Sequence, residues 1–245
     1  KVVHHKPFFW EDHYFRLMAA MRIMRMEIPM NFTLEFLLNE LQKITPNGAA
    51  RVRLTVFRNS GGRYRPTSNK VQFLLVSEPI DADLFSFDNS SYSVDLFKDF
   101  YVQPGLFSSL KTNNRALNVI GSRFAEDNDL QNCILLNPQK QLVEFLNGNL
   151  FLVKGTVIKT PSLSSGCIKG VVRKQLIQLV ESHPEYTIEE TEISPFELQK
   201  SDELWVTNAI QGIQPVRFYR KKEYRSAIAK IFTDLLNEHA IKSTS

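Results

Sequence analysis

Three features between residues 109 and 173 could together hold a phosphorylated cofactor that carries an aldehyde. Lys111 supplies an amine that can condense with the aldehyde, and Glu144 supplies a carboxylate that can keep a pyridinium nitrogen protonated. A loop of small residues, 161–166, precedes a helix predicted for about 168–179, and a helix N-terminus offers free N–H groups to a phosphate. Composition alone supports this set only weakly, because most lysines and glutamates are solvated surface groups.

Regular elements are predicted around these residues. Lys111 begins a polar, helix-forming run that continues to Glu126. The strands predicted next are 133–136, 141–145, 150–154 and 157–159. Asn137-Pro138 is a turn signal between the first two of them, which predicts a hairpin with Glu144 near the end of its second strand.

The rest of the chain alternates between helical and strand patterns. The predicted helices are 11–27, 33–43 with Thr33 as its N-cap, and 223–239, with a short helical turn at 195–199. The predicted strands are 51–58, 71–77, 93–96, 186–190, 204–207 and 215–220. This alternation indicates a mixed α+β or α/β fold. We expect a small domain over residues 1–80, a linker at 81–86 and a larger domain with Lys111 over 87–245.

Composition indicates a globular protein of the reducing cytoplasm. The chain has 245 residues, 43% of them hydrophobic, and no apolar run approaches the roughly 20 residues of a membrane helix. Cys133 and Cys167 have no metal-ligand partners at useful spacing, so neither a metal site nor a disulfide framework is expected. The net charge of +4 is spread along the chain, so a solvated surface is a better interpretation than a nucleic-acid patch.

Several segments in a fixed order carry a resemblance. They are Leu110–Arg115, Val143-Glu144 with Gly148–Phe151, Thr160-Pro161, Gly166–Arg173, and Asp202–Ala209 with Ile213–Val216. Together they resemble the class IV aminotransferases, which are fold-type IV pyridoxal-phosphate enzymes, over nearly the whole chain. Residues 12–17 are similar to a further motif of the family, whose arginine binds the cofactor phosphate.

The resemblance implies a two-domain fold like that of D-amino acid aminotransferase, with pyridoxal 5'-phosphate as the cofactor. It implies that Lys111 is catalytic and binds the cofactor covalently, with Glu144 on the pyridine nitrogen and Ile168 against the ring. The remaining implied cofactor contacts, all to the phosphate, are Arg16, Val171, Val172, Asn208 and Ala209. Family members also have an upstream first strand, so we expect that an N-terminal segment is missing from this sequence.

Within the family, the chain is most similar to the 4-amino-4-deoxychorismate lyases, which form 4-aminobenzoate and pyruvate for folate synthesis. Arg115, four residues after Lys111, and the Thr207-Asn208-Ala209 turn favour the lyases. The alternatives are a branched-chain or D-amino-acid aminotransferase, and a non-catalytic scaffold of the same fold. Candidate contacts to a small amino substrate are Arg63, Arg65 and Arg115, although the loop with the first two could equally be a plain exposed hairpin. The family further implies a homodimer.

Overall fold

The computed structural model describes residues 1–244, which form two compact units. Unit 1 contains residues 1–84 and the end of the chain from Glu238, and unit 2 runs from Phe85 to Asn237. The sequence predicts a boundary at 81–86 with everything after it in the larger domain. The end of the chain from Glu238 instead belongs to unit 1. It contacts Phe9 there: the Phe9 N–H donates to Ser243 Oγ at 3.2 Å, and the Phe9 and His239 rings lie 5.7 Å apart.

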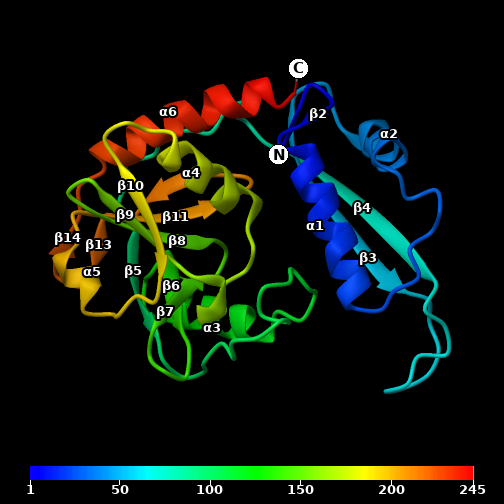
Figure 1. Ribbon diagram of the computed structural model, residues 1–245, viewed down its shortest axis with the longest axis horizontal. Coiled ribbons are helices and arrows are strands. Elements are labelled where there is room, and N and C mark those ends of the chain that lie inside the picture. Colours follow the sequence, from blue (N-terminus) through cyan, green and yellow to red (C-terminus); the bar gives the residue numbers. More distant parts are fainter. Residues whose placement is uncertain (245) are drawn as a thin grey trace. The chain divides into compact units, whose positions relative to one another are not determined.

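Unit 1 is an antiparallel sheet with two helices (Figure 1). Its elements are β1 (Val2–Val3), β2 (Lys6–Pro7), α1 (Trp10–Ile23), α2 (Leu34–Ile44), β3 (Ala49–Arg58) and β4 (Val71–Pro79). The strand order is β2-β1-β3-β4. Buried Met21 of α1 and Leu37 of α2 form a core with Leu54 and Phe73 of the sheet. Thr33 caps α2, as predicted, by accepting the Phe36 N–H at 3.1 Å.

Unit 2 contains two five-stranded sheets. One has the order β14-β13-β5-β6-β7 and the other β10-β9-β8-β11-β12. The strands are β5 (Ser93–Phe97), β6 (Asn132–Leu136), β7 (Leu142–Phe145), β8 (Asn149–Lys154), β9 (Val157–Pro161), β10 (Thr187–Thr191), β11 (Glu203–Asn208), β12 (Gly212–Pro215), β13 (Phe218–Tyr219) and β14 (Lys222–Glu223). The helices are α3 (Ala116–Asp127), α4 (Val171–Glu181) and α5 (Glu197–Lys200), together with most of α6 (Ala227–Lys242), whose last turn from Glu238 belongs to unit 1. The predicted mixed fold is therefore confirmed.

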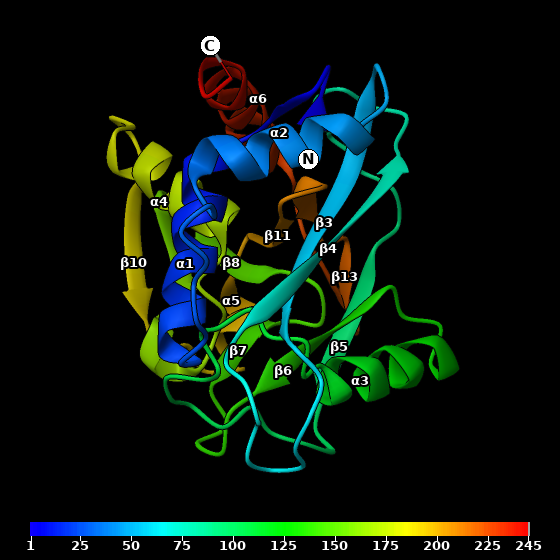
Figure 2. The same cartoon turned by 90° about the vertical axis from the view of Figure 1, so that its right-hand side faces the viewer.

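The core of unit 2 joins its two sheets. Ile134 and Phe145 of the first sheet pack with Leu150 and Val206 of the second in one buried cluster. Figure 2 shows α3 lying beside β5 and β6. The predicted hairpin is present as antiparallel β6 and β7, with Glu144 paired opposite Leu135. It places the functional glutamate candidate inside the unit.

Several predicted bounds are wrong for tertiary reasons. The helix predicted over 11–27 ends at Ile23, because Glu27 N–H donates instead to the Asn69 carbonyl. The strand predicted over 215–220 is broken, since its hydrogen bonds change from the β11 sheet to the β5 sheet. The helix predicted from residue 223 begins at Ala227, because Glu223 pairs with Phe218 in β14.

Candidate functional site

Glu144 is a buried carboxylate close to several positive charges. It lies in β7 and is only 5% exposed. Burial raises its pKa to about 7, while the Ile168 N–H, Arg115 and Lys111 act in the opposite direction. Glu144 Oε2 accepts the Ile168 N–H at 2.8 Å, and that is its one contact with a backbone donor among residues 1–244. A carboxylate with so little compensation for burial suits a cationic partner.

Lys111 lies in an exposed loop rather than in a helix. The helix predicted from Lys111 begins only at Ala116. Ser109 fixes the loop from one side, because its carbonyl accepts the Lys169 N–H at 3.1 Å. This bond places the lysine loop beside the segment that leads into α4, which is also the segment that contacts Glu144.

The start of α4 is open toward an anion. Its N-cap is Gly170, which has no side chain to cap the helix, and within residues 1–244 no hydrogen bond uses the N–H groups of Val171 or Val172. Such groups bind phosphate well, because they are unpaired donors at the positive end of the helix dipole. The predicted helix start near Ile168 is three residues too early, since the Ile168 N–H is committed to Glu144.

Asn149 joins the start of α4 to the end of β11. Its Nδ2 donates to the Ile168 carbonyl at 2.8 Å, and its Oδ1 would lie 2.1 Å from a Cβ built on Gly170. A side chain at Gly170 would therefore displace either Asn149 or the helix. Asn149 is also the sheet partner of Thr207. The segment that ends in Asn208 and Ala209 is thereby held next to α4.

The end of β11 offers further polar groups. Thr207 Oγ1 is buried, and among the described residues it has no hydrogen-bond partner. Asn208 shapes the following turn, since its Oδ1 accepts the N–H groups of Ile210 at 3.0 Å and Gln211 at 2.9 Å. A buried hydroxyl without a partner is costly, so it points to a ligand that would supply one.

The cysteines do not contribute a reactive group. Cys167 immediately precedes Ile168, and burial raises the pKa of its thiol to about 11. Burial has the same effect on Cys133. Both thiols stay protonated at neutral pH, which leaves Lys111 as the nucleophile candidate of this cluster.

The other predicted site residues belong to unit 1. Arg16 lies in α1, half-buried, with Nη2 3.4 Å from His13 Nδ1. Arg63 and Arg65 are exposed in the loop 59–70 between β3 and β4. That loop is narrowed by a bridge between Gly62 and Pro66, where Gly62 has φ +78° and leaves no room for a Cβ.

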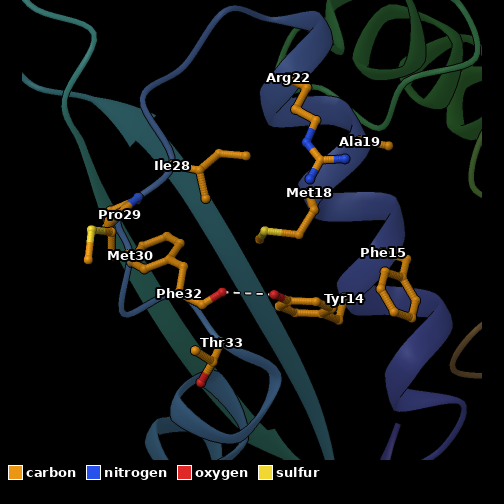
Figure 3. A pocket seen from close by; sticks show the side chains of 10 residues that line it. All are labelled: Tyr14, Phe15, Met18, Ala19, Arg22, Ile28, Pro29, Met30, Phe32 and Thr33. Atoms are coloured by element: carbon orange, nitrogen blue, oxygen red, sulfur yellow. Dashed lines mark hydrogen bonds between the residues drawn. The ribbon is translucent and has the colours of Figure 1, made fainter.

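A cavity of about 570 Å³ in unit 1 contains none of the predicted residues (Figure 3). Its walls come from α1 and from the segment before α2, and they are mostly apolar. They are Tyr14, Phe15, Met18, Ala19, Arg22, Ile28, Pro29, Met30, Phe32 and Thr33. The Tyr14 hydroxyl donates to the Phe32 carbonyl at 2.9 Å and closes one end. Arg22 is the one charged side chain in this lining, so the cavity lacks the amine and carboxylate of the chemistry above.

Sequence reasoning missed Asn149 and Thr207 as parts of the site. Asn149 was visible inside a motif, but its side-chain partner lies 19 residues further along the chain. Thr207 adjoined two predicted residues, and only burial shows that its hydroxyl has no partner. In contrast, the structure brings Lys111, Glu144 and Ile168 together with the start of α4, as their shared contacts show.

A model of the family described as amino-transferase class IV matches residues 1–219. The chain belongs to the class IV aminotransferase family. Among its relatives, a Vibrio harveyi protein named aminodeoxychorismate lyase is 23% identical over 211 residues, covering 84% of this chain and 76% of that protein. A Thermotoga maritima protein named a probable branched-chain-amino-acid aminotransferase is 29% identical over 219 residues, covering 86% of this chain and 72% of that protein.

The fold agrees with this family. The crystal structure of the branched-chain amino acid aminotransferase from Thermobaculum terrenum, in its pyridoxal-phosphate form, superposes with a TM-score of 0.84 at 19% identity. It covers 96% of this chain, and this chain covers 79% of it. Members of the class IV aminotransferase family are pyridoxal-phosphate-dependent lyases or transferases, and the chain is accordingly an enzyme with that cofactor.

The residues present fit pyridoxal 5'-phosphate. Glu144 is a buried carboxylate suited to a protonated ring nitrogen, the start of α4 has free N–H groups for a phosphate, and Lys111 supplies an amine. No group of three metal-binding side chains occurs in the part of the chain that the structure describes. Nor does any of its described helices have the length and apolarity to cross a membrane.

Proposed function

We propose that this class IV enzyme is a 4-amino-4-deoxychorismate lyase that forms 4-aminobenzoate and pyruvate in folate synthesis. The observation that carries this proposal is the segment from Lys111 to Arg115, which resembles the lyases rather than the transaminases. Its Arg115 folds back on the loop and contacts the carbonyls of Leu110 and Thr112, so the residue typical of lyases is part of the site's construction. The Vibrio harveyi relative supports the same assignment.

In this proposal each polar group of the cluster holds one part of the cofactor. Lys111 Nζ would bind its aldehyde carbon, Glu144 would hold the pyridine nitrogen, and Ile168 would pack against the ring. Val171 and Val172 would donate their N–H groups to the phosphate, together with groups of Asn208 and Ala209. The family resemblance alone adds Arg16 to the phosphate contacts. When bound, the cofactor supplies an electron sink for the carbon that bears the substrate amine.

The chain's own residues would then move a proton. After the substrate amine has replaced Lys111 on the cofactor, the freed Lys111 Nζ would act as the general base and take the proton from the ring carbon that bears the amine. The carbon–oxygen bond to the enolpyruvyl group breaks, and the ring becomes aromatic as 4-aminobenzoate. The departing group gains a proton at its methylene carbon and leaves as pyruvate, so the reaction consumes no water. Glu144 keeps the ring nitrogen protonated throughout.

Substrate contacts are proposed for three arginines. Arg63 and Arg65 lie on an exposed loop and could each bind a substrate carboxylate through a bidentate pair. Arg115 uses Nε and Nη2 on backbone carbonyls, which leaves Nη1 as its route to substrate. We further propose a homodimer, which light scattering of the purified protein would test by its molar mass.

The decisive experiment follows both products from enzymatically generated 4-amino-4-deoxychorismate. Purified protein with cofactor should release 4-aminobenzoate, detected by fluorescence, and pyruvate in equal amounts. Lys111→Ala should lose this turnover together with the absorbance of the lysine-bound cofactor. The Thermotoga maritima relative favours one alternative, a branched-chain aminotransferase. Transfer of an amino group from leucine to 2-oxoglutarate without release of 4-aminobenzoate would replace the lyase assignment by that one.

A further inference from the structure

Arg115 holds the loop that presents Lys111. Its Nε donates to the Thr112 carbonyl at 3.1 Å, and its Nη2 donates to the Leu110 carbonyl at 3.1 Å. These carbonyls belong to the residues directly before and after Lys111. Hydrogen bonds from a guanidinium are charge-assisted, and its planar geometry fixes both acceptors at once. The backbone on each side of the lysine is thus tied to a single rigid group.

Arg115 is also an unfavourable residue for its local position. It is the N-cap of α3, where Ser, Thr, Asp or Asn would normally accept a backbone N–H, and it makes no capping hydrogen bond. The first turn of α3 contains no acidic residue, so no carboxylate at that end of the helix offsets a cation at the positive end of its dipole. Residues that break a local rule in this way are expected at functional sites.

The surroundings of Arg115 connect it to Glu144. Arg115 is partly buried, and burial lowers its pKa while the charge of Glu144 raises it. Conversely, Arg115 and Lys111 both oppose the rise of the Glu144 pKa that burial causes. The charge of the guanidinium therefore acts on the pKa of the carboxylate, while its hydrogen bonds are directed at the lysine loop.

We propose that Arg115 is a positioning residue, which fastens the backbone on both sides of Lys111 and contributes its positive charge to the cluster that contains Lys111 and Glu144. The inference rests on the proposed role of Lys111 as the cofactor-binding lysine. It assigns to Arg115 a function in cofactor retention that is separate from any contact with substrate. It also applies equally to a lyase and to an aminotransferase.

Two substitutions separate the geometric effect from the charge. Arg115→Gln removes both, whereas Arg115→Lys retains the charge but cannot hold two carbonyls in a fixed fork. The matched control is Arg123→Gln, because Arg123 lies on the same helix and forms only surface ion pairs with Glu126 and Asp127. The three variants and the wild-type protein are compared without cofactor and with pyridoxal 5'-phosphate.

The first measurement is hydrogen–deuterium exchange of the cofactor-free protein, read by mass spectrometry. In both Arg115 variants we expect exchange of two loop-linked amides, the Leu110 N–H bound to the Phe107 carbonyl and the Lys169 N–H bound to the Ser109 carbonyl, to rise about tenfold, since the loop loses charge-assisted hydrogen bonds that hold its backbone. Dissociation of pyridoxal 5'-phosphate from the loaded enzyme should accelerate by a similar factor. Arg123→Gln should match the wild-type protein in both measurements.

The second measurement is the pH dependence of pyridoxal 5'-phosphate affinity. Arg115→Gln should move its midpoint to higher pH, because Glu144 loses a cation that favours its ionised form and its pKa rises further. Arg115→Lys should restore the wild-type midpoint while its loop still exchanges quickly. A merely structural arginine would produce no such shift.

Unchanged exchange and unchanged cofactor dissociation in both Arg115 variants would overturn the fastening role. If Arg115→Gln does not fold, the test rests on Arg115→Lys alone. Loop exchange as slow in Arg115→Lys as in the wild-type protein would then overturn the fastening role. A midpoint that stays fixed in Arg115→Gln would overturn the role of the charge. If the expected changes appear while no 4-aminobenzoate is formed, the lyase assignment fails and the inference on Arg115 stands.

Discussion

Two helices of unit 2 begin beside a buried glutamate, and the two glutamates are used differently. At the start of α6, Glu203 accepts the N–H groups of Ile228 at 2.8 Å and Ala229 at 2.9 Å, and also the Trp205 Nε1–H at 2.9 Å. At the start of α4, Glu144 accepts a single hydrogen bond from the described part of the chain, that of the Ile168 N–H, which lies before the helix. Glu203 thus accepts the first N–H groups of α6, whereas Glu144 accepts none of the first N–H groups of α4.

The number of hydrogen-bond donors around each buried carboxylate distinguishes a stabilising role from a functional one. Three donors offset the cost of burying Glu203, so this carboxylate needs no ligand to satisfy its hydrogen-bonding capacity. Glu144 has one backbone donor and a pKa raised to about 7, and its donor Ile168 leads into a helix start whose first N–H groups have no partner among residues 1–244. A region left incomplete in this way is expected to bind something that supplies the missing interactions.

The largest effect is expected from Glu144→Gln. The amide keeps an acceptor for the Ile168 N–H but cannot hold a protonated ring nitrogen, so kcat/KM should fall by roughly 100- to 1,000-fold, the scale of losing one preorganised electrostatic contact. Unfolding of the cofactor-free variant, followed by circular dichroism, should occur at or above the wild-type Tm. A loss of activity below about tenfold would contradict the functional assignment of this glutamate.

Glu203→Gln should show the opposite pattern. Its new NH₂ group would face donors, and the charge-assisted hydrogen bonds to α6 and Trp205 would weaken, so the free energy of unfolding should fall by about 3 kcal/mol. Urea titration measures this change. The folded fraction should retain wild-type kcat/KM at low temperature. A Glu203→Gln protein with wild-type stability but impaired turnover would contradict a purely stabilising role for Glu203.

The pH dependence of stability should distinguish Glu144 next. Its folded pKa of about 7 lies above the ordinary 4.5, so its contribution is fully present below pH 4.5 and is lost as pH rises through 7. Between pH 5 and 8 this amounts to roughly 2 to 3 kcal/mol of the free energy of unfolding. Denaturant titrations of cofactor-free protein should show this loss in the wild-type protein but not in Glu144→Gln. If the free energies of unfolding of the two proteins changed in parallel with pH, the pKa of Glu144 would not be raised in the folded state.

The smallest effect concerns the open start of α4. Val171→Pro removes one N–H at the first helical position, where proline fits, and Gly170 already has the extended backbone that precedes proline readily. Affinity for pyridoxal 5'-phosphate should weaken about tenfold, since one hydrogen bond to a charged group is lost. Val171→Ala is the matched control, because it loses most of the side chain and keeps the N–H. Equal affinities in the two variants would place the phosphate elsewhere.

The local pattern was sufficient for much of the fold around the site. The Asn137-Pro138 turn between two apolar runs predicted the β6–β7 hairpin and the place of Glu144 in it. Thr33 was recognised as a cap from its residue type alone. These features depend on neighbours within a few residues, and such interactions are encoded in a short stretch of sequence.

Contacts between side chains and backbone groups decided the features that the pattern placed wrongly. The helix predicted from Lys111 starts at Ala116, because Arg115 takes the loop carbonyls that a helix would have used. The start of α4 moved from Ile168 to Val171, because Glu144 and Asn149 hold both backbone groups of Ile168. Each of these contacts joins a backbone group to a side chain, and residue types alone do not say which carbonyl or N–H a side chain will reach.

The sequence by itself determined the family, the order of the elements and the candidate residues Lys111 and Glu144, since motifs record residue types in a fixed order. Only the tertiary structure decided which groups around them are satisfied. It showed that Glu203 accepts three hydrogen bonds and that Glu144 accepts one from a backbone N–H. It also showed that Arg115 donates its hydrogen bonds to the lysine loop. Burial and hydrogen bonding arise when distant segments pack together, so the polar groups left for a ligand can be identified only in the folded chain.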